Sequence, residues 1–156
     1  MCQGCQNKVV KNVAYRVDHV GSFLRPKELV EAREKFSKGE LSQEELTKVE
    51  DKTITELVEK QIANGLKGVT DGEFRRAYWH LDFFWGLNGV EHVQGEKGYP
   101  FKGIETKPDT AKVSGKISGE NHPFVAHYKF LRDLVADKEG VTVKLTIPSP
   151  SQLYFE

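Results

Sequence analysis

The feature of this sequence that most constrains its fold is the alternation of short apolar segments with longer amphipathic ones. Strands separated by helices are typical of βαβ units, in which neighbouring strands run parallel. We expect strands at 15–24, 67–72, 110–117 and 141–148, and helices at 25–40, 41–65, 75–87 and 122–140. Residues 88–110, rich in Gly, Lys and Glu, predict a hairpin or a long excursion. The order predicts an α/β fold with a parallel sheet of four strands.

Local signals mark the ends of the predicted helices. Ser42 and Glu45 form an S-x-x-E capping box, in which each side chain binds an otherwise unpaired backbone N–H of the other. Pro26 and Pro123 suit a first helical turn, and Gly39 suits a helix end.

The composition of the chain indicates one globular domain. Its 156 residues carry 23 basic and 23 acidic side chains, so no basic excess indicates nucleic acid as a partner. No apolar run is long enough to cross a membrane, and the N-terminus lacks the apolar stretch of a signal peptide. We expect a cytoplasmic protein with a flexible tail at 1–14 and a domain at 15–156.

The N-terminal tail contains Cys2 and Cys5 in a C-x-x-C arrangement. This spacing provides half of a zinc site or a redox pair, but no second such pair follows. His80, His92, His122 and His127 show no metal-ligand spacing with one another. An incidental tail is the favoured interpretation of the two cysteines.

The ends of the strands are the segments to examine for a site, because parallel α/β folds bind ligands there. After the first strand, Gly21 allows close backbone approach, and Ser22 with nearby amides could hold a carboxylate or a phosphate. A plain turn with a serine cap explains the same residues. After the second strand, "DGEFRR" places Asp71 and Glu73 beside two arginines, which could clamp an anion or hold Glu73 in place. These acids could bind an ammonium group or cap the next helix.

An aromatic segment follows this turn. Its side chains could form a stacking wall for a flat ligand, although aromatic residues in α/β domains are more often part of the core. The residues are Tyr78, Trp79, Phe83, Phe84 and Trp85.

Four motifs together resemble the cobalamin-independent methionine synthase family, and in particular its shorter single-barrel members. They are "DHVGSFLRP", "QIANGL", "VTDGEFRR" followed by "WHLDFFWGLNG", and "VKLTIPSPSQL", which agree in order from about residue 15 onward. The resemblance implies the first half, about four β/α units, of a TIM (β/α)8 barrel. It also implies a 5-methyltetrahydropteroyltriglutamate–homocysteine S-methyltransferase type of enzyme. Such an enzyme transfers a methyl group from a methylated folate, or a similar donor, to the zinc-activated thiol of homocysteine, without cobalamin.

The resemblance also assigns roles to individual residues. Gly21 and Ser22, in "VGSF", would hold the carboxylate of homocysteine or methionine, and Glu73 would bind its ammonium group. From the same two strand ends we also count His19 and Asp71 among the substrate-binding residues, with His19 in a variant form of the first loop. On the folate side the matching stretch contains Thr146, Pro148 and Tyr154, with Tyr154 as the stacking aromatic residue.

The chain departs from the family pattern at the metal. The family's zinc ligands, which are a histidine, a glutamate and two cysteines, come from the second half of the barrel, and Cys2 and Cys5 do not match them. We therefore expect no catalytic residue and no metal site in this half, and no activity from the chain alone. Two alternatives are a truncated, non-catalytic binding module and a barrel of the uroporphyrinogen-decarboxylase type. Open sheet edges near His19 and Leu145 predict self-association.

Overall fold

The computed structural model describes residues 18–96, 98, 102–103, 106 and 108–155, so the predicted tail at 1–14 lies outside the described residues. Five helices and four strands occur in this part of the chain. In order they are α1 (Lys27–Ser37), α2 (Gln43–Ala63), β1 (Gly68–Val69), α3 (Leu81–Trp85), β2 (Asn88–Gln94), β3 (Asp109–Ser118), α4 (Pro123–Leu134), β4 (Thr142–Val143) and α5 (Pro150–Phe155).

Helices α1 and α2 form an antiparallel hairpin whose ends follow the sequence signals. The predicted capping box is confirmed, since Ser42 Oγ accepts from Glu45 N and Glu45 Oε2 accepts from Ser42 N at 2.9 Å. Pro26 precedes the first turn of α1. Gly39 follows its last turn with φ of 74°, a left-handed conformation that glycine adopts without strain.

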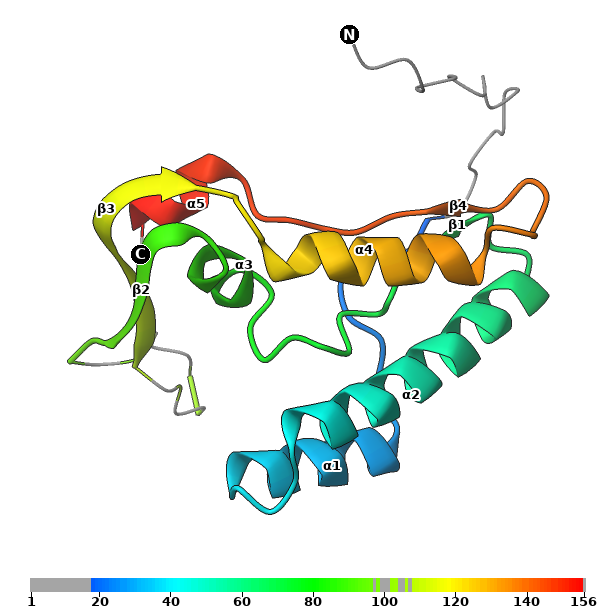
Figure 1. Ribbon diagram of the computed structural model, residues 1–156, viewed down its shortest axis with the longest axis horizontal. Coiled ribbons are helices and arrows are strands. Elements are labelled where there is room, and N and C mark those ends of the chain that lie inside the picture. Colours follow the sequence, from blue (N-terminus) through cyan, green and yellow to red (C-terminus); the bar gives the residue numbers. More distant parts are fainter. Residues whose placement is uncertain (1–17, 97, 99–101, 104–105, 107, 156) are drawn as a thin grey trace, which may run out of the picture.

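Strands β1 and β4 pair in parallel at the centre of the larger half of the molecule. Gly68 lies opposite Thr142 and Val69 opposite Val143. The ladder extends by one bond beyond the strands, because Lys144 N donates to Val69 O at 2.9 Å. Figure 1 shows α4 beside this pair, with α1 and α2 beyond it.

The main hydrophobic core lies between this parallel pair and the helices. Leu29 of α1, Ile54 of α2 and Leu131 of α4 are completely buried in it. The remaining members are Val58, Val69, Phe74 and Val135. Burial of an aliphatic side chain of this size stabilises a fold by about 1.5–3 kcal/mol, so these residues fix the helices against the strands.

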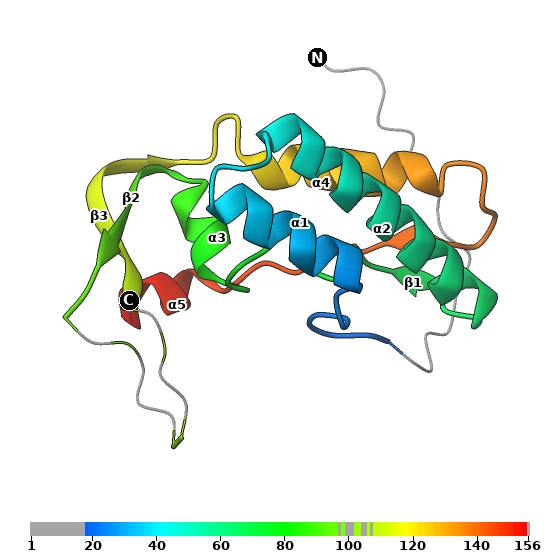
Figure 2. The same cartoon turned by 90° about the horizontal axis from the view of Figure 1, so that it is seen from below.

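A second, smaller core lies at the other end of the molecule, where β2 and β3 form an antiparallel hairpin (Figures 1 and 2). Leu81 and Phe84 of α3 pack against Val90 of β2 and Ala111 of β3. The hairpin interpretation of residues 88–110 is therefore confirmed for its first strand, β2, whereas the second strand is β3, which lies almost entirely beyond that range.

Several predicted elements were wrong. Residues 110–117 do not join the parallel sheet, because β3 pairs with its neighbour in sequence, β2. No strand forms over 18–24, and residues 15–17 lie outside the described part. The segment 141–148 is a strand only at Thr142–Val143. A parallel sheet of four strands is thus absent among the described residues, and the fold is α/β with two small sheets.

The predicted helix at 75–87 was also too long, because α3 begins only at Leu81. Residues 71–76 form turns in which backbone groups bind each other and nearby side chains. Asp82 accepts from the backbone N–H groups of Ala77 and Tyr78, which fixes the chain ahead of α3 in a non-helical path. None of the helices in the described part is both long and apolar enough to span a membrane.

Candidate functional site

Three segments that are far apart in the sequence meet at the carboxyl ends of β1 and β4. Phe23 N donates to Gly72 O at 3.1 Å, which places the 18–25 loop beside the turn after β1. Lys144 Nζ, just after β4, binds Asp18 Oδ1 at 2.6 Å and also His19 O. All three segments therefore contribute to the site predicted at the strand ends. The first contributes a loop instead of the predicted strand.

The turn after β1 is held by side chains as well as by its own backbone. The amide of Gln61 binds both backbone groups of Thr70, with Nε2 donating to Thr70 O at 2.8 Å and Oε1 accepting from Thr70 N at 3.0 Å. Asp71 Oδ1 accepts from Glu73 N at 3.0 Å. Gly72 and Glu73 have φ of 64° and 58°, so two consecutive residues are left-handed. For Glu73 this conformation is strained and must be maintained by its surroundings.

The Glu73 carboxylate lies at the centre of this convergence, on a side chain that is only 11% exposed. Its Oε1 accepts from Thr146 Oγ1 at 3.0 Å and lies 3.5 Å from Arg76 Nη1. Arg76 Nη2 donates to Thr146 O at 2.5 Å, so the three groups are linked. No hydrogen bond to Glu73 Oε2 occurs within the described part of the chain. A buried carboxylate with one acceptor oxygen still available can bind an N–H donor such as an ammonium group.

Arg76 makes further contacts that hold the Glu73 turn. Its guanidinium lies over the ring of Phe124 at 4.6 Å and donates to Trp79 O at 3.1 Å. The sequence left open whether the arginines after Glu73 bind an anion or hold Glu73. The second role fits Arg76, whose side chain is 3% exposed.

The predicted residues of the first loop are close to this turn. His19 stacks on Phe23 with ring centroids 3.7 Å apart, and its Nε2 binds Gly21 O at 3.1 Å. Gly21 has φ of 89°, and the Ser22 side chain is exposed. The loop therefore presents a serine and a permissive backbone at the edge of the site.

The three residues predicted for the folate side do not lie together in the structure. Thr146 binds Glu73 directly, and Pro148 is buried two residues later. Tyr154 is 88% exposed on α5, at the opposite end of the molecule from β1 and β4 (Figure 1). Its ring lies beside that of Phe155, with the ring centroids 5.7 Å apart. Tyr154 is thus not brought to the Glu73 site in this structure.

Sequence reasoning missed three residues that shape the site. Arg25 Nη2 donates to Glu73 O at 3.0 Å and to Arg76 O at 2.7 Å. Gln61 and Lys144 hold the strand end and the first loop as described above. A signal existed for Gln61, because it is a buried polar residue at a core-facing position of α2. Such a residue needs a hydrogen-bond partner.

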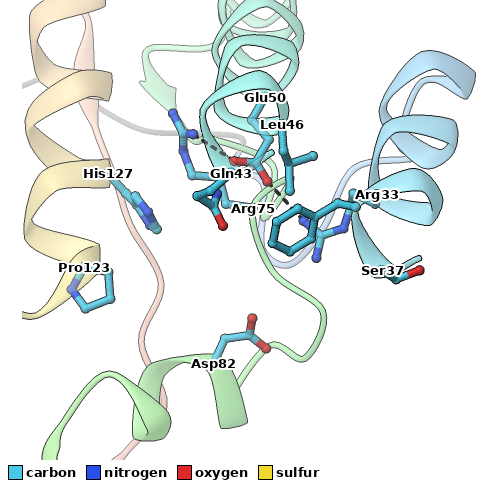
Figure 3. A pocket seen from close by; sticks show the side chains of 10 residues that line it. Arg33, Ser37, Gln43, Leu46, Glu50, Arg75, Asp82, Pro123 and His127 are labelled. Atoms are coloured by element: carbon cyan, nitrogen blue, oxygen red, sulfur yellow. Dashed lines mark hydrogen bonds and ion pairs between the residues drawn. The ribbon is translucent and has the colours of Figure 1, made fainter. Parts of the chain in front are cut away.

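A cavity of about 580 Å³ lies between α1, α2, α3 and α4, next to the turn (Figure 3). Glu50 of α2 lies on its wall between Arg33 and Arg75. Burial raises the pKa of Glu50, and the two arginines act against that effect. Burial, followed by the positive charges of Arg75 and Arg76, lowers the pKa of His127 to about 4.

The aromatic segment belongs mainly to the second core. Phe84 is buried, and Tyr78, Phe83 and Trp85 pack against it or its neighbours. Tyr78 OH donates to Asp109 Oδ2 at 2.5 Å, which ties the segment to β3, and burial with this bond raises the pKa of Tyr78 to about 12.

Residues that could hold a metal do not gather in the described part of the chain. No group of three or more His, Cys, Asp or Glu side chains there has the geometry for a metal ion. Cys2 and Cys5 lie outside the described residues. The described residues therefore do not fit the zinc site that the resemblance implies for the complete barrel.

No protein-family model matches the chain. Two uncharacterized proteins of Bacillus subtilis, YxjH and YxjG, are each 43% identical to it, over 97% and 93% of its length. The chain spans 40% and 38% of those proteins, so it corresponds to about two fifths of them.

Two solved structures are similar to the chain. One, from Listeria monocytogenes, is provisionally described as a vitamin-B12-independent methionine synthase. It is 43% identical with a TM-score of 0.71, over 88% of this chain and 37% of that one. The other is a B12-independent methionine synthase from Shewanella in complex with selenomethionine. It is 24% identical with a TM-score of 0.55, over 74% of this chain and 32% of that one, and supports the fold alone. These comparisons confirm the resemblance to the family predicted from the motifs.

Proposed function

Because the chain resembles vitamin-B12-independent methionine synthases, we propose that it forms the amino-acid-binding part of a methyltransferase of that type. The complete reaction would transfer a methyl group from a methylated folate, or a similar donor, to the thiol of homocysteine. The chain spans less than half of the length of its relatives, so we propose for it only the binding of the amino acid in that reaction.

The observation that carries the proposal is the environment of Glu73. Its carboxylate is buried where three chain segments meet, and Thr146 and Arg76 orient it while Oε2 keeps acceptor capacity. This arrangement suits the ammonium group of an amino acid. Hydrogen bonds between charged groups contribute about 1.5–3 kcal/mol, enough for selective recognition.

Ser22 and the backbone near Gly21 would hold the carboxylate of the same amino acid. Both residues are in the loop that Phe23 N fastens to Gly72 O. Asp71 is buried beside Glu73 and would add negative charge near the ammonium group. His19 would keep this loop in place through its bond to Gly21 O.

The chemistry at the thiol would require groups beyond the described residues. When bound in the complete barrel, zinc would make the thiol a better nucleophile by favouring its thiolate form. The described residues do not provide its ligands, so we assign to them only the binding and orientation of the amino acid. We also propose that the parallel pair β1–β4 is part of an incomplete (β/α)8 barrel, with Thr146 and Pro148 on its rim.

Isothermal titration of the chain with L-methionine tests this proposal. Glu73→Gln should weaken binding by about 1.5–3 kcal/mol, because the neutral amide lacks the charge that attracts ammonium. Glu59→Gln, at an exposed position of α2, is the matched control and should bind as the wild type does. Thermal unfolding of both variants would verify that the fold is retained.

Two results would count against the proposal. If the wild-type protein binds no L-methionine at millimolar concentration, the proposed amino-acid site is refuted. Equal affinity of Glu73→Gln and wild type would reduce Glu73 to a structural residue of the turn.

A further inference from the structure

We propose that Arg33 is a positioning residue for Glu73, and that the α1–α2 hairpin holds the left-handed turn through it. This inference rests on the proposed function insofar as Glu73 binds the ammonium group. It concerns Arg33, which neither the sequence motifs nor the comparisons assign to the site. Its evidence is a set of arginine contacts to the backbone of the turn.

Arg33 lies on α1 and reaches the turn after β1. Its Nη1 donates to Phe74 O at 3.1 Å and to Glu50 Oε1 at 3.2 Å. Phe74 directly follows Glu73, and its carbonyl group belongs to the peptide unit that continues the turn. A single guanidinium therefore connects α1, α2 and the turn.

Glu50 makes this connection rigid. It is buried on α2, and its other oxygen accepts from Arg75 Nη1 at 3.1 Å. Arg75 also pairs with Asp51, so its side chain anchors the turn to α2 from a second direction. Figure 3 shows Glu50 between Arg33 and Arg75, with both ion pairs drawn. Charged side chains in a buried network have little freedom to move, because each alternative position leaves a charge unpaired.

Arg25 provides an independent contact of the same kind. Its Nη2 binds the carbonyl oxygens of Glu73 and Arg76. Together Arg25 and Arg33 bind the backbone of the turn at Glu73, Phe74 and Arg76. The arginines thus hold the backbone on the C-terminal side of Glu73, and the bond from Phe23 N to Gly72 O holds it on the N-terminal side.

The left-handed backbone of Glu73 is strained, and these contacts oppose its relaxation. A non-glycine residue with φ of 58° relaxes to another conformation unless its surroundings prevent it. Relaxation would rotate the side chain away from Thr146, which lies 3.0 Å from the carboxylate. The arginine contacts therefore fix the direction of the carboxylate as well as the path of the chain.

Hydrogen exchange of the full chain tests this role without any ligand. In Arg33→Met, the amides of Phe74 and Arg76, which donate to Asp71 O and Glu73 O, should exchange at least about tenfold faster. The amides of Thr142 and Lys144 in the β1–β4 ladder should keep their protection. Lys52→Met is the control, because Lys52 also joins the two helices through Glu28, but at the surface.

The exchange result decides the inference. Unchanged protection of Phe74 and Arg76, or an equal loss throughout the chain, would overturn it. If Arg33→Met does not fold, Arg33→Lys serves instead. The lysine side chain is one atom shorter, so its ammonium does not reach the position of Nη1, the nitrogen that donates both bonds, and faster exchange confined to the turn is still expected.

A binding comparison separates this inference from the proposed function. L-Methionine and 4-(methylthio)butanoate, which lacks the amino group, are titrated into each variant. Arg33→Met should lose affinity for L-methionine about tenfold or more and leave the weaker affinity for the analogue unchanged. Loss for both ligands indicates a general structural role and refutes positioning. If the wild type binds neither ligand, the proposed function is refuted. The role of Arg33 in holding the turn is then still tested by hydrogen exchange.

Discussion

Replacing Gly72 by alanine should destabilise the protein more than the same change at another left-handed glycine. A Cβ at position 72 would lie 2.4 Å from Leu57 Cδ2 and 3.2 Å from the ring of Phe74. Leu57 packs against the main core, so it has little room to withdraw. We expect about 1–2 kcal/mol for the left-handed backbone and about 1–3 kcal/mol for the crowding.

Gly39→Ala is the matched control for this prediction. Gly39 has φ of 74°, close to the 64° of Gly72, and no atom lies within 4 Å of the Cβ that would be added. The backbone cost and the entropy change of the unfolded chain are therefore shared by the two variants. The difference between them isolates the crowding, about 1–3 kcal/mol.

Urea denaturation followed by circular dichroism measures both variants. A free energy of unfolding that falls equally in Gly72→Ala and Gly39→Ala would refute the reasoning. It would mean that Leu57 adapts without loss and that the turn is not packed tightly against α2.

Burial lowers the pKa of His127 from 6.5 to about 4, so between these pH values the unfolded chain binds a proton there that the folded protein does not bind. The free energy of unfolding should therefore fall as the pH falls through this window. His127→Gln should reduce the drop in urea midpoint between pH 7 and pH 5, and a drop as large as in the wild type would contradict the burial argument. Exposed apolar side chains occur in the loop at 18–25 and in the segment after β4, namely Val20, Leu24 and Ile147. We therefore also expect the chain to self-associate. Light scattering over a dilution series should show this as a decreasing mass, whereas a constant mass of one chain at micromolar concentration, with cooperative unfolding, would contradict it.

Local patterns in the sequence predicted local structure well. Helix α2 was predictable because its capping box and its apolar spacing agree. A hairpin was suggested within residues 88–110, because that segment is rich in Gly, Lys and Glu and alternates weakly. The pairing of β3 was still wrong in our prediction, because an alternating apolar pattern does not state which strand is the partner.

The site was only partly predictable for a related reason. Glu73 and Thr146 follow the two strands that pair, and the motif resemblance pointed to both. The contacts of Arg25 and Arg33 with the turn join residues more than forty positions apart. No periodicity or spacing encodes such contacts, since they depend on how α1 packs in the complete fold.

The parallel pairing of β1 with β4 has a consequence for how the site assembles during folding. Its two strands are about seventy residues apart, whereas the α1–α2 and β2–β3 hairpins join neighbouring segments. Closing a loop of that length costs about 4 kcal/mol of chain entropy, so we expect this pair to form late. The bond from Thr146 to Glu73 spans the same closure. Pulsed hydrogen exchange should therefore protect the amides of α2 before that of Lys144, and the reverse order would show that the strand ends meet early.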